Sequence, residues 1–270
     1  MEEKNIKKIV RDGYAEIAKQ TSSCCGPAKS CCGSGDVVDN QGRKLGYTEI
    51  DLSNIPEGAN LGLGCGNPVA LASIKEGEVV LDLGSGAGID CFLAAKKVGE
   101  KGKVIGVDMT PEMLDRAREN VRKSNYKNIE FRLGEIENLP VADNSVDLII
   151  SNCVINLSTD KRRVFEEAFR VLKPSGRIMV SDIVILKDLP ANIKESVAAY
   201  VGCVAGAINK NEYIKSIKEA GFREVKIVDE TYYPVDYITD NPVIHITPEQ
   251  ARDITKSIAS IKVSGVKPSF

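Results

Sequence analysis

The sequence has no excess of basic residues, no long apolar run and only one histidine. Its 36 Lys and Arg residues are balanced by 38 Asp and Glu residues, which gives a formal net charge of −2. Domains that bind nucleic acids normally carry a basic excess, so we expect no nucleic acid partner. No run reaches the roughly 18 apolar residues of a membrane span, and the N-terminus opens an amphipathic stretch instead of an apolar signal core. We therefore expect no membrane association and a cytoplasmic location.

Cysteine, in contrast, is plentiful, with eight residues in the chain. A reducing compartment disfavours structural disulfides, so this number favours metal binding or redox chemistry. The alternative is that some of these residues are small buried hydrophobes. We interpret Cys91 in that way, because it lies on the apolar face of a predicted helix at residues 89–98.

Strand and helix patterns alternate through the middle of the chain. Apolar strands are predicted at residues 79–83, 103–107, 129–133, 146–151 and 177–182, with helices at 89–98, 111–124 and 160–172. This rhythm is typical of an α/β protein with a Rossmann-like, doubly wound and mostly parallel sheet. Beyond it, helices are predicted at residues 193–207 and 210–220, and closing strands at 223–231 and 258–266.

The flanking segments suggest three parts. Residues 1–75 form an N-terminal cysteine-containing segment with a helix at 5–19, a Gly- and Pro-containing loop at 24–35 and a short helix at 69–72. Residues 76–186 form the Rossmann-like core. Residues 187–270 form a C-terminal α+β extension, in which residues 232–255 hold three prolines and look like an inserted loop.

A glycine-rich loop follows the first predicted strand. Gly84, Gly86 and Gly88 alternate there, with Asp82 just ahead of them. Glycine lets the backbone turn tightly and approach a ligand without a Cβ in the way. A dinucleotide site would have the spacing G-x-G-x-x-G and would hold a pyrophosphate, which the Asp82 carboxylate would repel. The loop favours a cofactor that carries a cationic amino group and a sulfonium.

Acidic residues follow the next two strands. Asp108 ends the second strand, where a carboxylate can bind ribose hydroxyls. Glu135 follows the third strand, where an adenine edge would lie. We therefore predict S-adenosylmethionine binding; the alternative is a tight turn in some other α/β protein. The predicted cofactor-binding residues are Asp82, Gly84, Ser85, Gly86, Asp108, Met109, Gly134, Glu135, Ile136 and Asn152.

Three cysteines lie on separate segments that could meet at this end of the sheet. Cys153 follows the fourth strand, Cys203 lies on a predicted helix beyond the fifth, and Cys65 lies in a glycine-rich segment before the first. Ligands of an open α/β sheet bind at the carboxyl ends of its strands, so the three thiols could converge there. The alternative is that Cys153 and Cys203 are ordinary buried residues.

Four motifs resemble those of arsenite S-adenosylmethionine methyltransferases. They are GLGCGNP at 62–68, DLGSGAGID at 82–90, SNCVINL at 151–157 and YVGC at 200–203. The resemblance runs from about the cysteine-rich loop to about residue 231. It implies that Cys65, Cys153 and Cys203 bind trivalent arsenic. It also implies that a thiol of the Cys31–Cys32 pair is the redox partner of Cys65.

The implied chemistry suits this composition. Trivalent arsenic is soft and takes three thiolates in a pyramid, leaving a lone pair that can attack a sulfonium methyl group. That nucleophile carries no proton, so no general base is needed, which agrees with the single histidine, His245, in the proline-containing insert. Methylation formally oxidises arsenic, and a thiol pair can return the electrons by forming a disulfide. An external thiol of the thioredoxin or glutathione type would then reset the enzyme.

Other interpretations remain open at this stage. The Cys24–Cys25 and Cys31–Cys32 pairs could bind zinc, although adjacent cysteines differ from the usual Cys-x2-4-Cys spacing. The chain could methylate a small organic acceptor such as a quinone or sterol, with the three cage cysteines idle. It could also bind arsenic or another metal without turnover. Arsenite and methylarsenite are the expected substrates of the first interpretation.

Overall fold

The structure of the chain is a computed structural model, and it describes residues 3–20, 34–188, 206–232 and 256–269. Within these ranges no helix is long and apolar enough to cross a membrane. The predicted helix at 193–207 and the insert at 232–255 fall almost entirely outside them, and so does His245.

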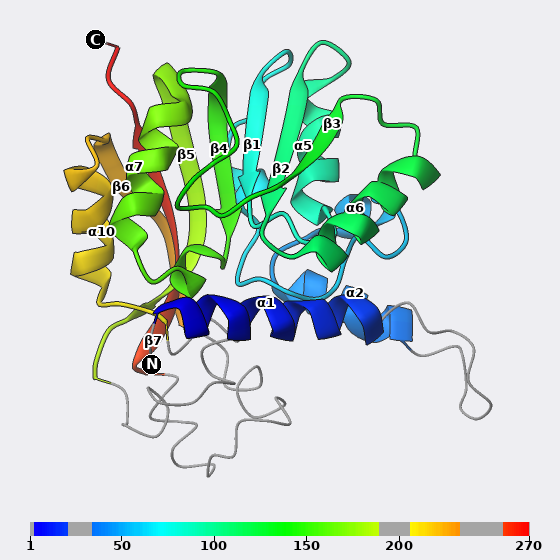
Figure 1. Cartoon of the computed structure of the whole chain (residues 1–270), viewed down its shortest axis with the longest axis horizontal. Helices are drawn as coiled ribbons and strands as arrows, with labels where there is room; N and C mark the ends of the chain where they lie inside the picture. The colour runs from blue at the N-terminus through cyan, green and yellow to red at the C-terminus, as the bar shows by residue number, and fades with distance from the viewer. Residues whose placement is uncertain (1–2, 21–33, 189–205, 233–255, 270) are drawn as a thin grey trace.

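A seven-stranded sheet forms the centre of the molecule, in the order β3-β2-β1-β4-β5-β7-β6 (Figure 1). The strands are β1 (Val79–Leu83), β2 (Lys103–Asp108), β3 (Ile129–Leu133), β4 (Val146–Asn152), β5 (Leu172–Ile185), β6 (Arg223–Tyr232) and β7 (Ile258–Val266). The first five pair in parallel, whereas β7 is antiparallel to both β5 and β6. The predicted doubly wound, mostly parallel fold is therefore confirmed.

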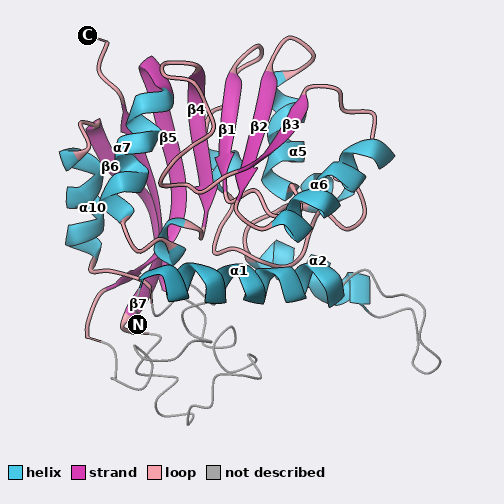
Figure 2. Ribbon diagram, viewed as in Figure 1, coloured by secondary structure: helices cyan, strands magenta, loops and turns pink. Residues whose placement is uncertain are grey.

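Helices cover both faces of the sheet (Figure 2). The helices are α1 (Glu3–Gln20), α2 (Ser34–Lys44), α3 (Glu49–Ser53), α4 (Pro68–Leu71), α5 (Ile89–Val98), α6 (Pro111–Lys123), α7 (Lys161–Val171) and α10 (Lys210–Glu219). Buried side chains of α7 and α10 form one hydrophobic cluster with the sheet. Those of α4, α5 and α6 belong to a second cluster with side chains of the same strands. Alternate residues of a strand face opposite sides, so the sheet contributes to both clusters.

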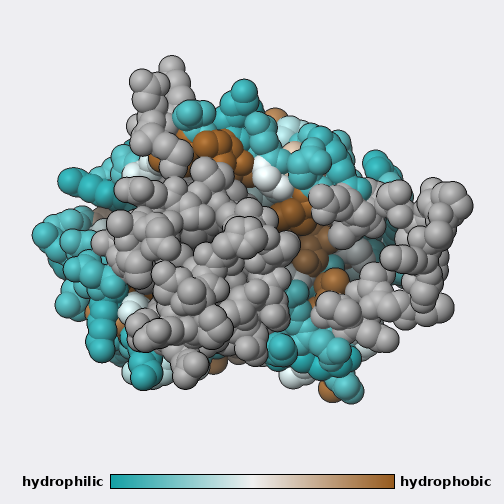
Figure 3. Space-filling model, turned by 90° about the horizontal axis from the view of Figure 1, so that it is seen from below, coloured by the Kyte–Doolittle hydropathy of each residue, from teal (hydrophilic) through white to brown (hydrophobic). Residues whose placement is uncertain are grey.

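The strand order reverses between β1 and β4, because the chain builds outward from β1 in both directions. In open α/β sheets, ligands bind beyond the carboxyl ends of the strands at such a point. Helix α1 runs across this end of the sheet, along the lower side of Figure 1. Figure 3 views the molecule from that side. The described residues at its rim are mainly hydrophilic, and some hydrophobic residues are visible among them.

The N-terminal segment contains two helices that its sequence did not predict. Helix α2 begins at Ser34, inside the range 24–35 that was predicted as a loop. Helix α3 begins at a capping box, in which the Asp51 amide donates to the Thr48 hydroxyl and the Thr48 amide donates to the Asp51 carboxylate. The capping box satisfies free amide groups at the start of the helix. It stabilises a helix too short to show a hydrophobic period.

The fifth strand is longer than predicted. It begins at Leu172, directly after α7, and the turn residues Pro174, Ser175 and Gly176 lie within it. The pairing of β4 with β5 shifts register here, and Ser175 has a positive φ of 65°. The turn-forming residues Pro174, Ser175 and Gly176 therefore mark a bulge that bends β5, and they do not mark the start of the strand.

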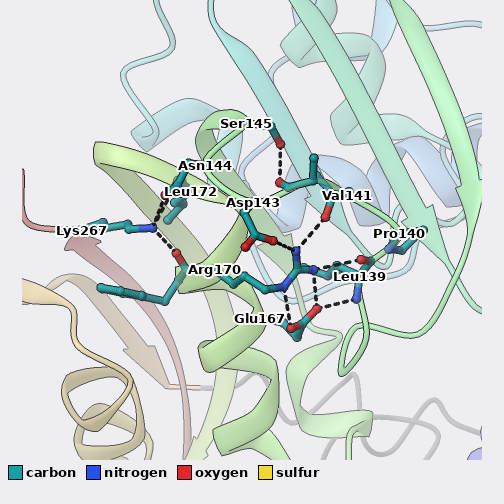
Figure 4. Close-up of polar contacts among 12 residues, drawn as sticks. Leu139, Pro140, Val141, Asp143, Asn144, Ser145, Glu167, Arg170, Leu172 and Lys267 are labelled. Carbon is teal, nitrogen blue, oxygen red and sulfur yellow. Dashed lines mark hydrogen bonds and ion pairs between the residues drawn. The ribbon is translucent and has the colours of Figure 1, made fainter.

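An ion-pair cluster around the buried Glu167 fixes the connection between β3 and β4 (Figure 4). Glu167 of α7 is 2% exposed and accepts hydrogen bonds from Arg170 (2.7 Å) and from the backbone N–H of Leu139 (2.9 Å). Arg170 also donates to the carbonyl oxygens of Leu139 and Val141. Hydrogen bonding to Arg170 lowers the pKa of Glu167. The cluster holds the segment that carries the predicted adenine-edge residues.

We expect Glu167→Gln to lower the free energy of unfolding by about 2 kcal/mol at pH 7, because charge-assisted hydrogen bonds contribute about 1.5–3 kcal/mol. A lowered pKa means that the contribution is present above the unfolded-state pKa and is lost as the pH falls through the folded-state value. The stability difference between the wild-type and Glu167→Gln proteins should therefore begin to shrink below about pH 4.3, the ordinary pKa of Glu, and should vanish only below the lowered folded-state pKa. Urea denaturation at several pH values measures this.

The neighbouring Glu166→Gln is the matched control. Glu166 pairs with Arg162 on the exposed side of α7, with side chains 38% and 70% exposed. Exposed pairs contribute little, so its loss should cost under about 0.5 kcal/mol. Equal losses for the two variants would contradict the role given to the ion-pair cluster.

Candidate active site

The glycine-rich loop after β1 packs tightly against neighbouring elements. Gly84 has φ +67°, and a Cβ there would lie 2.3 Å from the Val154 side chain, so no other residue fits without a shift. Gly86, with φ +51°, faces open space instead. The amides of Gly84 and Ser85 both donate to the carbonyl oxygen of Val107 on β2. The loop is thus fixed on one side and open on the other.

Asp108 at the end of β2 holds this loop in place. One of its carboxylate oxygens accepts a hydrogen bond from the Gly86 amide (2.9 Å) and the other accepts one from the Thr110 amide (2.8 Å). Burial raises the pKa of this carboxyl group despite these bonds. Each oxygen keeps a further acceptor position, as the predicted contact with ribose hydroxyls requires. Met109, the next residue, is half-buried.

Two buried carboxyl groups lie beneath the loop. Asp82 of β1 and Asp90 of α5 are each 3% exposed, and within the described part of the chain neither forms an ion pair. Burial, and then the charge of Asp90, raises the pKa of Asp82 well above its usual range. Burial also raises the pKa of Asp90 to about 6. A cationic ligand would relieve both effects, because an opposite charge favours the ionised carboxylate.

Cys91 contacts this acidic pair. It is completely buried, as predicted, and its thiol donates a hydrogen bond to Asp82 over 3.2 Å. Burial raises the pKa of the thiol well above its usual value. Cys91 is therefore a buried, protonated partner of Asp82 and lacks the thiolate character that metal binding requires.

The side chain of Asn152, at the end of β4, joins the acidic pair to the N-terminal segment. The two N–H groups of its amide are shared among three acceptors, which are Asp90 (3.2 Å), the Tyr47 hydroxyl (3.0 Å) and the carbonyl oxygen of Gly66 (2.7 Å). Its carbonyl oxygen accepts a hydrogen bond from the Cys65 amide (3.0 Å). The Tyr47 hydroxyl in turn donates to Asp90 (2.9 Å).

Sequence reasoning did not identify Tyr47 or Asp90 as site residues. Tyr47 is the first residue of the segment 47–59, which lacks a clear hydrophobic period, so its sequence context does not indicate a position near the sheet. Asp90 lies in the first turn of α5, where an acidic residue is explained by the helix dipole alone. Only the fold brings both to the carboxyl end of β1.

The predicted adenine side lies after β3. Ile136 is buried in the hydrophobic cluster of α7 and α10, and a Cβ on Gly134 would lie 2.6 Å from Pro140. The carboxylate of Glu135 forms an ion pair with Lys7 of α1 (2.7 Å), and Glu137 lies 3.2 Å from the same lysine. Helix α1 is thus attached to this side of the candidate site.

These residues fit a ligand with a cationic amino group. The loop has an open side at Gly86, and two buried carboxyl groups lie below it without a cation of their own in the described ranges. The hydroxyl oxygen of Ser85 is buried and has no hydrogen-bond partner. Buried polar atoms are rarely left unpaired, so the free hydroxyl indicates a place where a ligand atom would bind.

Two of the three predicted cage thiols lie together. The sulfur atoms of Cys65 and Cys153 and a carboxylate oxygen of Asp182 all lie within 4.8 Å of one another, and all three residues are buried. Cys153 has a positive φ of 61°, and its amide donates to the carbonyl oxygen of Ser181 on β5 (2.8 Å). This unusual backbone conformation directs the chain out of β4 at the thiol.

Cys65 is held from three sides. In addition to its amide bond to Asn152, its carbonyl oxygen accepts a hydrogen bond from the Ser260 hydroxyl of β7 (2.7 Å). Its sulfur lies 3.7 Å from the Ser181 hydroxyl. The segment that precedes the sheet is therefore attached to β4, β5 and β7 at this residue.

Asp182, the third member of this cluster, was not among the predicted site residues. It is fully buried on β5, and its carboxylate accepts hydrogen bonds from the Tyr213 hydroxyl (3.2 Å) and from the Ile183 amide (3.1 Å). Burial raises its pKa to about 7. A signal was present, because Asp182 ends the predicted fifth strand as Asp108 ends the second.

The remaining predicted thiols lie outside the described residues. These are Cys203, the proposed third arsenic ligand, and Cys31 and Cys32, the proposed redox pair, together with Cys24 and Cys25. Their assignments stay predictions.

Comparison with known proteins gives a consistent family. A family model described as a methyltransferase domain matches residues 74–221. The arsenite methyltransferase of Halobacterium salinarum is 44% identical over 273 residues, which cover 97% of this chain and 67% of that protein. That of Aquipseudomonas alcaligenes is 36% identical, over 98% of this chain and 74% of the relative.

A solved structure points the same way. The crystal structure of an arsenic(III) S-adenosylmethionine methyltransferase from Chlamydomonas reinhardtii aligns with 84% of this chain and 73% of its own, at 34% identity and a TM-score of 0.63. Sequence and fold thus agree over most of the chain. The chain belongs to the arsenite methyltransferase family.

Proposed function

We propose that this protein transfers a methyl group from S-adenosylmethionine to trivalent arsenic held by Cys65, Cys153 and Cys203. The observation that carries the proposal is the meeting of two thiols from distant segments at the carboxyl end of the sheet. Asn152 connects their position directly to the acidic pair under the glycine-rich loop. Family membership supports both halves of the site.

The methyl donor would bind across the ends of β1 and β2. Asp82 and Asp90 would face its cationic amino acid end, and Asp108 its ribose hydroxyls. Ser85 would pair its free hydroxyl with the ligand. When bound, the donor supplies an electrophilic methyl group. The protein's part is to hold that group and the acceptor in line, since positioning alone can remove several kcal/mol of a barrier.

The thiols would bind the acceptor in a form that is ready to react. Thiolates suit soft ions, and three of them leave the lone pair of trivalent arsenic free. The lone pair carries no proton, so the reaction needs no general base at the reacting centre. Cys65 and Cys153 are each 7% exposed, and burial keeps water from the arsenic–sulfur bonds.

A thiol–disulfide step would complete the cycle. Methylation leaves arsenic formally oxidised by two electrons, and two thiols supply two electrons when they form a disulfide. We propose Cys65 and one residue of the Cys31–Cys32 pair for this step, and an external thiol of the thioredoxin or glutathione type as the reductant. Arsenite and methylarsenite would be successive substrates.

Other functions would leave specific features unexplained. A methyltransferase for a small organic acceptor would have no use for two buried thiols beside a carboxylate. A binding protein without turnover would have no use for the glycine-rich loop. Incubation with arsenite, a thiol and methyl-labelled S-adenosylmethionine separates the three, because methylated arsenic forms only in the first. Its absence under conditions in which both ligands bind would overturn the proposal.

The role of Asp108 can be tested by calorimetry. Asp108→Ala removes the acceptors for the ribose hydroxyls, and charge-assisted hydrogen bonds are each worth about 1.5–3 kcal/mol. We expect at least tenfold weaker S-adenosylmethionine binding with arsenite binding retained. Asp115→Ala, on the exposed surface of α6, is the control and should bind both ligands as the wild type does. Unchanged cofactor affinity in Asp108→Ala would reject the role.

The valence of arsenic predicts a difference among the cage cysteines. Arsenite offers three positions to thiolates, whereas methylated trivalent arsenic offers two, so one cysteine becomes dispensable. Cys153 directly follows β4, whereas Cys65 lies on the separate segment before the sheet, and Asn152 and Ser260 attach that segment to the sheet. We expect Cys65→Ser to fail on arsenite but to methylate monomethylarsenite.

Cys153→Ser and Cys203→Ser should fail on both substrates. Chromatographic separation of arsenic species after single turnovers measures this for all three variants. A Cys65→Ser protein that is inactive on both substrates, yet folded and able to bind S-adenosylmethionine, would overturn the assignment of the dispensable thiol.

The redox step predicts a particular cross-link. Peptide mapping of a single turnover, quenched with an alkylating agent, should find Cys65 joined to Cys31 or Cys32. Protein kept with arsenite but without the methyl donor is the control and should show only alkylated thiols. If product forms while all three cysteines stay reduced, another reductant acts directly on arsenic.

A further inference from the structure

We propose that Asp182 is a catalytic residue of the methyl transfer, whose carboxylate stabilises the positive charge that arrives on arsenic. This inference rests on the proposed function and adds a role for the one member of the buried cluster that is not a thiol. Its basis is position: the carboxylate oxygen lies within 4.8 Å of both the Cys65 and the Cys153 sulfur atoms. An atom bonded to both sulfurs would lie beside it.

The charge balance of the reaction defines what has to be stabilised. The lone pair of arsenic forms the new arsenic–carbon bond, and the sulfur–carbon bond of the donor breaks with its electrons left on sulfur. Sulfur loses its positive charge and arsenic gains it. No proton is transferred, so the main electrostatic event at the acceptor is the arrival of a cation among buried thiolates.

The buried surroundings of Asp182 strengthen the interaction between its charge and a positive charge on arsenic. All members of the cluster are buried, and charges interact far more strongly in such a site than in water. Fixed groups aimed at the place where charge develops commonly supply the largest share of catalysis. A carboxylate beside arsenic favours the charged product state over the neutral acceptor.

The carboxylate is also fixed in advance. The Tyr213 hydroxyl donates to one oxygen and the Ile183 amide to the other. The ammonium group of Lys161 is held by the carbonyl oxygens of Asn156 and Ser158. Burial raises the pKa of Asp182, and the charge of Lys161 opposes that shift. These contacts come from α10, β5 and the start of α7, so the group needs no rearrangement as charge develops.

Two other roles would give the same geometry. Asp182 could be a structural acceptor for Tyr213, or it could act as a ligand that holds arsenic. Loss of either role should weaken arsenic binding together with the rate, because the thiols would be displaced or a ligand lost. The electrostatic role lowers the rate at unchanged arsenic affinity, because its effect appears only when positive charge forms on arsenic.

The test is Asp182→Asn, which keeps the shape of the side chain and removes its charge. Rapid-quench single turnovers with arsenite and S-adenosylmethionine, both saturating, give the rate of methyl transfer. Arsenic bound after desalting and calorimetry with the donor give the two affinities. We expect methyl transfer to slow at least tenfold, equivalent to about 1.4 kcal/mol, with both affinities within threefold of the wild type.

Asp147→Asn is the matched control. Asp147 lies on β4 at the opposite end of the sheet and pairs with Lys173 (2.9 Å), so its loss tests whether weakening the same sheet slows the reaction. It should transfer methyl groups at the wild-type rate. Tyr213→Phe provides a second variant, which keeps the charge but removes one donor; we expect a smaller decrease in rate, of about threefold, with arsenic affinity unchanged.

The outcomes are distinguishable. An Asp182→Asn protein that transfers methyl groups within threefold of the wild-type rate overturns the inference, as does one whose rate falls only in proportion to lost arsenic binding. If the Asp182→Asn protein does not fold, an unchanged rate in Tyr213→Phe overturns it instead. A wild-type protein that binds both ligands and forms no methylated arsenic refutes the proposed function itself.

Discussion

The rest of the site depends on the hydrogen bonds of the Asn152 side chain. From the end of β4 it binds the acidic residue Asp90, the Tyr47 hydroxyl and the backbone on both sides of the Cys65–Gly66 peptide bond. One amide thereby sets the distance between the candidate donor site and the thiols. A partly wrong position of the acceptor can cost a large part of the rate, so this single contact has more influence than its own energy suggests.

The two halves of the site use charge in opposite ways. Below the glycine-rich loop, Asp82 and Asp90 lie close together without a cation in the described part of the protein, and burial raises the pKa of both. That arrangement is unfavourable until a cationic ligand enters. At the thiols, a single carboxylate lies beside the place of an acceptor that becomes positive only during the reaction. The first arrangement favours binding and the second favours reaction.

The sequence predicted those parts of the site that follow from regular elements. The ends of β1, β2 and β4 were recognisable from apolar runs, and Asp82, Asp108 and Cys153 lie at those ends. Tyr47 and the helices α2 and α3 were not predicted: the position of Tyr47 depends on contacts with distant residues such as Asn152, and α3 is too short to show a hydrophobic period. Asp182 was not predicted for another reason: soft ions favour sulfur ligands, and a carboxylate among thiols does not fit that pattern.

The hydrogen bond from Ser260 to the carbonyl oxygen of Cys65 joins residues 195 positions apart. Strand β7, which carries Ser260, lies between β5 and β6 and is among the last described parts of the chain to be synthesised. Contacts of such sequence separation form late, because a long loop has to close first. A chain without β7 lacks one of the three contacts that hold Cys65. The position of Cys65, and with it the pair of thiols, is therefore complete only after the last described strand has joined the sheet.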